Sequence, residues 1–348
     1  MTASNPNKNK FFLARSGFLL IVLLPAITNA QFNLGANQLP SLNIKPTLSL
    51  NLDPATPLPN SVITVIANLS GPANVENSDY TWFLNGVKQN NASGVNKNIY
   101  AFQVGNLGAV YRVNVNVSTP AGDNLSDSTF FTVSDFDITW SASSEAPASY
   151  KGKLLPTQNS TIVVSALPFI YRPGSKTLIS ADDLIFNWTI DDKLSKSKSG
   201  LNKSDFILKI DDFAGSEKSL RLEIKTADAT VSAIKNITIP VVRPQTLIYF
   251  NNLETNSPYG GALKNLITIP AVFNFIAKNY FFNSPDKDLK WQWFVNSNEV
   301  PAETDKPWLA SLDLSNFSQF FSVQIQTIIK NPANETETAQ STINLQVK

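Results

Sequence analysis

Carboxylates in closely spaced pairs are the residues of this chain best suited to chemistry. Acidic doublets occur at Asp182-Asp183, Asp191-Asp192 and Asp211-Asp212. Carboxylate oxygens are the ligands that calcium prefers, and a pair of carboxylates can also hydrolyse a glycosidic bond. Because no EF-hand spacing accompanies the doublets, turn residues in contact with water are the simpler interpretation. We therefore predict no metal site and no catalytic residue.

Other catalytic and metal-binding chemistries lack their residues altogether. The sequence contains no cysteine and no histidine, and its single methionine is Met1. The imidazole and thiolate ligands of zinc, copper, haem and iron–sulfur sites are therefore missing. A cysteine nucleophile, or a nucleophile activated by histidine, is excluded for the same reason. We expect a protein that is not an enzyme and carries no cofactor.

Aromatic side chains near the C-terminal end form a second group suited to recognition. Tyr280, Phe281 and Phe282 are consecutive, and Trp308 lies in the same region. Successive residues of a strand point to opposite faces, so three aromatic residues in a row cannot all enter one core. Exposed aromatic side chains favour contacts with proteins or with sugar rings. These four residues are a candidate binding surface, and a large core with a seam between domains is the alternative.

The elements that position these residues repeat along the chain. Trp82, Trp188 and Trp293 lie 106 and 105 residues apart. A β-branched run precedes each tryptophan, at 61–69, 160–170 and 265–275, and a second one follows 28 to 32 residues later. In the second runs apolar and polar residues alternate, which is typical of a half-buried strand. The core positions that this repeat predicts are Trp82, Trp188, Trp293, Tyr111, Leu220 and Phe321.

About seven short strands per hundred residues, with Pro, Gly, Asn and Ser between them, are typical of a two-sheet sandwich. No long helical periodicity interrupts them, so we predict an all-β fold of three tandem sandwiches. Asn85-Gly86 has the composition of a two-residue hairpin turn after the first tryptophan, and Asp191-Asp192 and Ser297-Asn298 take comparable places.

The repeat also predicts the domain boundaries. Residues 31–45 are an extended lead-in, and the sandwiches cover 46–134, 135–243 and 244–348. One or two residues separate neighbouring sandwiches, and Pro244 fixes one backbone angle at the second junction. Short junctions of this kind restrict hinge motion.

The first thirty residues have the layout of a secretory signal peptide. Lys8, Lys10 and Arg15 precede an apolar run of 11 residues, Gly17 to Ile27, and Ala30 provides a small residue for cleavage. An uncleaved membrane anchor is the alternative, although the run is short against the roughly 20 residues that cross a bilayer. We expect an exported protein found outside the cell or at its surface, in contact with membrane only if this segment is retained.

Charge argues against nucleic acid as a partner. Loss of residues 1–30 removes three positive charges and changes the net charge from +1 to −2. A chain with this balance has no electrostatic attraction to nucleic acid.

Residues 82–86, WFLNG, followed by YRVNVNV at 111–117, resemble the central strands of immunoglobulin-like and PKD-like modules. Such modules are common in tandem on bacterial secreted and cell-surface proteins. The immunoglobulin cysteine pair and the PKD motif WDFGDG are both missing. The resemblance implies β-sandwiches in an extracellular setting and a role in adhesion, display or spacing, with a protein or glycan at a cell surface as partner. A carbohydrate-binding protein that uses the aromatic third domain is the alternative.

Overall fold

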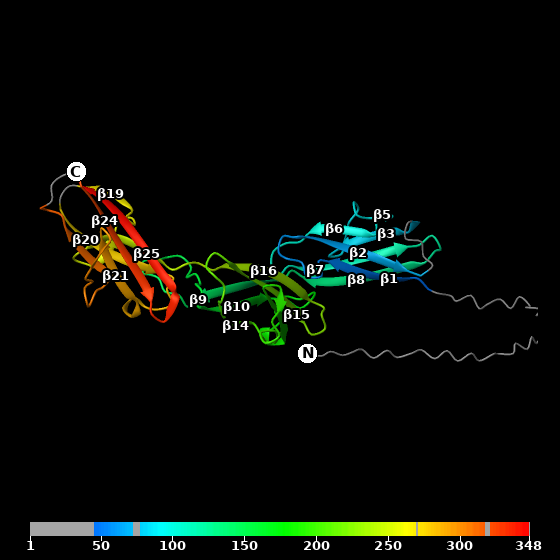
Figure 1. Ribbon diagram of the computed structural model, residues 1–348. Coiled ribbons are helices and arrows are strands. Elements are labelled where there is room, and N and C mark those ends of the chain that lie inside the picture. The colour runs from blue at the N-terminus through cyan, green and yellow to red at the C-terminus, as the bar shows by residue number, and fades with distance from the viewer. Residues whose placement is uncertain (1–44, 72–76, 269–270, 317–320, 348) are drawn as a thin grey trace, which may run out of the picture. The chain divides into compact units, whose positions relative to one another are not determined.

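The computed structural model describes residues 45–71, 77–268, 271–316 and 321–347, and most of them lie in strands (Figure 1). The helical elements of this described part include two short 3-10 turns, η2 (Ala181–Asp183) and η3 (Asp286–Asp288). The signal peptide predicted for residues 1–30 and nearly all of the lead-in lie outside the described residues.

The first sandwich is built from eight strands. One sheet has the order β1-β2-β6, and the other has the order β4-β3-β7-β8 with β5 also paired to β3. Their bounds are β1 (Thr47–Asp53), β2 (Val62–Ser70), β3 (Asp79–Leu84), β4 (Val87–Lys88), β5 (Gly94–Val95), β6 (Ile99–Gln103), β7 (Val110–Ser118) and β8 (Asn124–Thr132). Trp82 lies on the central strand β3 and packs in a core cluster with Ile63 and Val115.

The second sandwich repeats this layout. Its sheets have the orders β14-β10-β9 and β12-β11-β15-β16, and β13 also pairs with β11. Their bounds are β9 (Asp135–Ala142), β10 (Thr161–Phe169), β11 (Leu184–Ile190), β12 (Lys193–Leu194), β13 (Gly200–Leu201), β14 (Asp205–Lys209), β15 (Glu217–Thr226) and β16 (Ser232–Pro240). Because every pairing of the first sandwich has its counterpart here, the two sandwiches share one topology.

The third sandwich differs at its first strands. Its sheets have the orders β18-β17-β20-β23 and β19-β25-β24-β21-β22, and β19 runs parallel to β25. Their bounds are β17 (Gln245–Asn252), β18 (Ser257–Tyr259), β19 (Asn265–Thr268), β20 (Val272–Tyr280), β21 (Lys290–Val295), β22 (Asn298–Val300), β23 (Leu309–Asp313), β24 (Phe321–Asn331) and β25 (Asn334–Val347). The three sandwiches have separate hydrophobic cores, which confirms the predicted all-β tandem fold.

One predicted strand is two strands in the structure. The run 265–275 is divided between β19 and β20, which belong to different sheets. Pro270 lies between them in the sequence and has no N–H with which to continue a strand ladder. The hydrophobic pattern alone predicted one continuous strand over 265–275.

The hairpin turn after each tryptophan has the same backbone in all three sandwiches. Its two central residues have positive φ angles, which a two-residue turn of this type requires. The angles are 49° and 84° for Asn85 and Gly86, 46° and 61° for Asp191 and Asp192, and 47° and 67° for Asn296 and Ser297. The third turn therefore begins one residue before the predicted Ser297-Asn298.

The last strand of each sandwich is fastened to an earlier strand of the same sandwich. In the first sandwich Asp127 of β8 accepts a hydrogen bond from the Leu50 N–H of β1 at 3.0 Å. In the second, Lys235 of β16 donates to the Phe136 carbonyl of β9 and pairs with Asp135 at 3.0 Å. In the third, β19 pairs with β25 directly. These links cover strand edges that could otherwise pair with another chain.

The last strand of each sandwich ends close to a predicted boundary: β8 at Thr132, β16 at Pro240 and β25 at Val347. Contacts also join neighbouring sandwiches, so that residues 45–348 form one compact unit. Independent folding of the segments 46–134, 135–243 and 244–348 stays a prediction.

Candidate functional site

The three repeated tryptophans are core residues and are not accessible to a ligand. Trp82 and Trp188 are 0% exposed and Trp293 is 1% exposed. Burial of an indole N–H costs free energy unless it finds an acceptor. Each indole donates to a backbone carbonyl 14 or 15 residues further along the chain: Trp82 to Lys97 at 2.7 Å, Trp188 to Lys203 at 2.8 Å and Trp293 to Pro307 at 2.9 Å.

The other three predicted core positions also lie against the cores. Leu220 is fully buried, and Phe321 is half-buried against the third core. Tyr111 is half-buried, and its hydroxyl accepts a hydrogen bond from the Gly105 N–H at 2.7 Å. A tyrosine near the start of this strand that is bonded to backbone upstream is the tyrosine corner of immunoglobulin-like domains.

A short repeated motif that the analysis of the sequence missed holds two of the tryptophans. The segments 93–97 (SGVNK) and 199–203 (SGLNK) lie 106 residues apart. The serine Oγ accepts from the tryptophan backbone N–H, at 3.0 Å for Ser93 and 2.9 Å for Ser199. The lysine that ends the motif supplies the carbonyl for the indole. Comparison of the segments after Trp82 and Trp188 would have revealed it.

Two of the three acidic doublets contribute to one ion-pair cluster. Lys218 is buried, and its Nζ lies 2.6 Å from Asp191 and 2.5 Å from Asp212. Burial by itself lowers the pKa of Lys218, but the hydrogen bonds and charges of the two aspartates outweigh it and raise this pKa above its usual value. The partner of these carboxylates is a lysine of the same sandwich.

Lys218 takes the position that Tyr111 has in the first sandwich. Trp188 pairs with Leu222 and Trp82 pairs with Val115, so Lys218 and Tyr111 each lie four residues before the partner of the tryptophan. Each contacts the residue six positions upstream, Asp212 in one case and Gly105 in the other. The ion pair of Lys218 with Asp212 therefore takes the place in the second sandwich that the hydrogen bond between Tyr111 and Gly105 has in the first.

The other residues of the three acidic doublets lie on the surface. Asp182 and Asp183 are exposed in η2, where the Asp182 N–H donates to the Ser180 hydroxyl at 3.4 Å. Asp192 and Asp211 are also exposed. Within the described ranges no three acidic residues lie close enough together to hold a metal ion.

The consecutive aromatic residues of the third sandwich lie at its contact with the second, which we call the second seam. Phe281 and Phe282 are 6% and 1% exposed, so they differ from the exposed surface expected of them. Glu145 forms a β-bridge there: its N–H donates to the Phe282 carbonyl at 2.7 Å, and its carbonyl accepts from the Phe281 N–H at 2.6 Å. The physical reasons differ: Phe282 packs in the core of the third sandwich, and Tyr150 of the second sandwich packs edge-on against Phe281, with ring centres 5.6 Å apart.

Tyr280 and Trp308 are half-buried. The Tyr280 hydroxyl lies 2.9 Å from that of Tyr249, and burial together with this bond raises the pKa of Tyr280. Tyr150 of the second sandwich packs edge-on against Tyr280, with ring centres 5.8 Å apart. Trp308 packs against Trp291, with ring centres 6.3 Å apart. The alternative of a core with a seam therefore describes these residues better than a binding surface does.

A buried carboxylate completes the second seam. Glu337 of β25 is 1% exposed and accepts from the Thr157 hydroxyl at 2.9 Å and the Asn331 side chain at 2.6 Å. It also accepts from the Asn283 N–H at 3.2 Å and from the Asn283 side chain. Thr157 belongs to the second sandwich and the other three residues to the third. One carboxylate thus accepts from four donors, of which the Thr157 hydroxyl lies across the seam.

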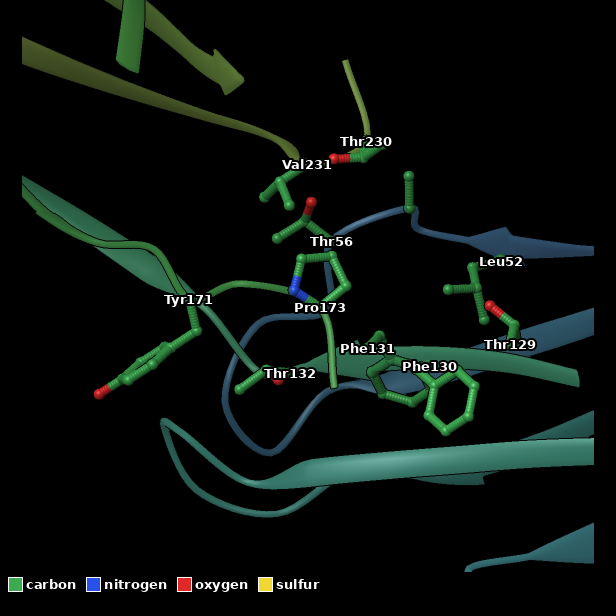
Figure 2. Close-up of a pocket in the computed structure, with 11 residues that line it drawn as sticks. Leu52, Thr56, Thr129, Phe130, Phe131, Thr132, Tyr171, Pro173, Thr230 and Val231 are labelled. Atoms are coloured by element: carbon green, nitrogen blue, oxygen red, sulfur yellow. The ribbon is translucent and has the colours of Figure 1, made fainter. Parts of the chain in front are cut away.

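A pocket of about 310 Å³ lies where the first and second sandwiches meet, a contact that we call the first seam (Figure 2). Phe130, Phe131 and Pro173 give it an apolar wall. Two of its hydroxyls are engaged in the seam, because Thr132 donates to the Ser175 carbonyl at 2.9 Å and Thr56 accepts from the Ser232 N–H at 2.9 Å. Among the described residues, its lining includes no carboxylate and no cation.

In the described part of the chain, no helix has the length and apolar character that a membrane crossing requires. No family model and no curated protein matches the sequence.

Solved structures of tandem domains align with the chain at low similarity. The three N-terminal domains of the highly immunogenic outer capsid protein of bacteriophage RB49 match 87% of this chain and 100% of theirs, at 10% identity and a TM-score of 0.24. The fibronectin(III)-like modules of Clostridium thermocellum CbhA match 56% and 94%, at 12% identity and 0.27. A 1.5-MDa bacterial ice-binding adhesin matches 87% and 98%, at 11% identity and 0.22. Similarity this low says nothing about function. The fold follows from the strands, sheets and cores of the chain itself, which define an all-β protein of tandem immunoglobulin-like sandwiches.

Proposed function

We propose that this protein is a non-enzymatic, extracellular protein of the cell surface that serves in adhesion or as a spacer within a surface assembly. The observation that supports the proposal most directly is that hydrogen bonds join each sandwich to the next, at Thr132 and Thr56 in the first seam and at Glu145 and Glu337 in the second. Such contacts oppose free hinge motion at short junctions. A chain of this kind is suited to hold a binding surface in place.

Export to the cell surface is tested by fractionation of the producing cells and mass spectrometry of the recovered protein. We expect a mature chain that starts at Gln31, in the envelope fraction or in the medium. Envelope-bound protein should become accessible to added protease on intact cells. Recovery only from the cytoplasm, with Met1 still present, would contradict the proposal. Recovery of a chain with an intact N-terminus from the membrane fraction would mean that residues 1–30 are not cleaved and act as a membrane anchor.

Glycan binding through the aromatic residues of the third sandwich was the alternative function. The burial of Phe281 and Phe282 argues against that surface, because a sugar ring in solution cannot stack on them. A glycan would need an aromatic side chain that is exposed.

A further inference from the structure

A cleft of about 290 Å³ lies beside the second seam and is separate from the pocket of Figure 2. Three segments line it: the loop after β14, the junction that leads into β17, and the start of β25. They contribute Phe213, Arg243 and Thr338 respectively, and Gln158 lines it as well. A concave site lined by an aromatic ring and several polar groups is the usual form of a small-ligand site.

Phe213 is the most exposed large apolar side chain in the described part of the chain, at 75%. Its backbone is nevertheless fixed, because the Ser216 N–H and hydroxyl both donate to its carbonyl, at 3.1 Å and 2.6 Å. The ring adds little to the core of its own sandwich. A fixed backbone and an exposed ring are what a stacking platform needs.

The polar side chains of the cleft fall into two groups. In the first group, Thr157 and Glu337 are bonded to each other across the seam at 2.9 Å, and the Thr336 hydroxyl donates to the Asn334 side chain at 2.8 Å. The side chains of Gln158, Arg243 and Thr338 form no hydrogen bond or ion pair with any residue that the structure describes. Together these three offer an amide, a guanidinium and a hydroxyl, which can both donate and accept. Sugar hydroxyls have the same double capacity.

The charges in the cleft bear on whether a neutral or an acidic sugar fits it. The cleft contains one cation, Arg243, and one carboxylate, Glu337, so its formal charges cancel. A ligand with a carboxylate or sulfate would gain Arg243 as a partner but would meet the like charge of Glu337, so the two charges together give it no net attraction. A neutral ligand meets no such cost.

We propose that this cleft binds a hexopyranose unit of a neutral glycan, stacked on Phe213 and hydrogen-bonded by Gln158 and Arg243. The inference rests on the proposed surface function and names its partner. It moves glycan recognition from the aromatic residues of the third sandwich to the exposed ring of the second.

The test is titration calorimetry of the chain 31–348 with neutral oligosaccharides of glucose, mannose, galactose and N-acetylglucosamine, and with oligogalacturonate as the acidic counterpart. We expect one or more neutral oligosaccharides to bind and F213A to weaken that binding roughly tenfold or more. R243M should weaken it as well. Phe169 is exposed on the same sandwich outside the cleft, so F169A is the matched control and should leave affinity unchanged.

Each other outcome contradicts the inference. These outcomes are failure of every neutral oligosaccharide to bind, tighter binding of oligogalacturonate than of any neutral sugar, and equal affinity of F213A and the unchanged chain. Unchanged melting temperatures of F213A and R243M would show that both variants are folded. A chain that is found on the cell surface but binds no sugar would defeat only this inference, whereas recovery from the cytoplasm would defeat the proposed function.

Discussion

Each of the three core tryptophans pairs its single polar atom with a backbone carbonyl from the segment that leads back to the opposite sheet. A buried indole with this bond contributes its full apolar area without an unsatisfied N–H. The carbonyls that accept these bonds belong to Lys97, Lys203 and Pro307, which share no side-chain chemistry. The position of the backbone is therefore what the three sandwiches have in common.

Trp188→Phe should destabilise the second sandwich by about 2 kcal/mol, because it leaves a cavity and an unpaired Lys203 carbonyl. A loss of this size lowers the melting temperature of that sandwich by about 10 °C. Differential scanning calorimetry of the chain 31–348 measures it. Trp140 is half-buried outside the central strands, so Trp140→Phe is the control and should shift melting far less. Equal shifts would contradict a special role for the indole bond.

The Lys218 cluster gives stability a dependence on pH. Its pKa is raised in the folded state, so its contribution is present below the ordinary lysine pKa of about 10.4 and is lost as pH rises through the folded-state value. Lys218→Met removes the contribution and should lower the melting temperature at neutral pH. The gap between the unchanged chain and the variant should then shrink above about pH 10.4. A gap that stays constant up to pH 11.5, by circular dichroism melting, would argue that packing and not charge is lost.

At the scale of elements, the second seam joins a loop of the second sandwich to β20 and β25 of the third. Phe281 has a φ angle of 65°, which bulky residues rarely adopt, and the bridge to Glu145 and the burial of its ring hold it there. Glu337 accepts four hydrogen bonds beside it. Specific hydrogen bonds and buried side chains therefore hold the second seam together.

Glu337→Ala should weaken this seam, because the donors of Thr157, Asn283 and Asn331 lose their common acceptor. Unpaired buried donors cost about 1–3 kcal/mol each, less where water enters. Hydrogen exchange should show faster exchange of the Phe281 amide, which bonds across the seam. Glu335 is exposed on the same strand, so Glu335→Ala is the control. Unchanged protection of Phe281 in Glu337→Ala would show that the carboxylate does not hold the seam closed.

At the scale of the whole molecule, the boundaries at 134/135 and 243/244 predict fragments that fold alone. We expect fragments 135–243 and 244–348 to melt cooperatively, and the joined fragment 135–348 to melt several degrees higher because only it contains the second seam. Calorimetry of the three fragments measures this. Halves that melt as they do when joined would show that the seam adds no stability. If fragments 135–243 and 244–348 do not fold alone, the predicted boundary at 243/244 is wrong.

The sequence by itself determined the class of fold and the core tryptophans. The alternation of apolar and polar residues, the Asn85-Gly86 turn and the spacing of 106 and 105 residues between the tryptophans can be read from the sequence without knowing how the strands are arranged. The Lys218 cluster was partly within reach of the sequence, because its two aspartates belong to doublets that were already notable. Their partner was not, since a lysine 27 residues from Asp191 carries no signal of its own.

Tertiary structure alone decided which aromatic residues are exposed. The sequence predicted Phe281 and Phe282 as a surface. In the structure Phe282 packs in the core of the third sandwich, and Tyr150, more than a hundred residues earlier in the chain, packs against Phe281. Phe213 belonged to no predicted pattern and is exposed. Thr157 and Glu337 are separated by 180 residues. Contacts over such distances depend on how whole sandwiches meet, and the free energy that holds them comes from burial and hydrogen bonds that no local pattern encodes.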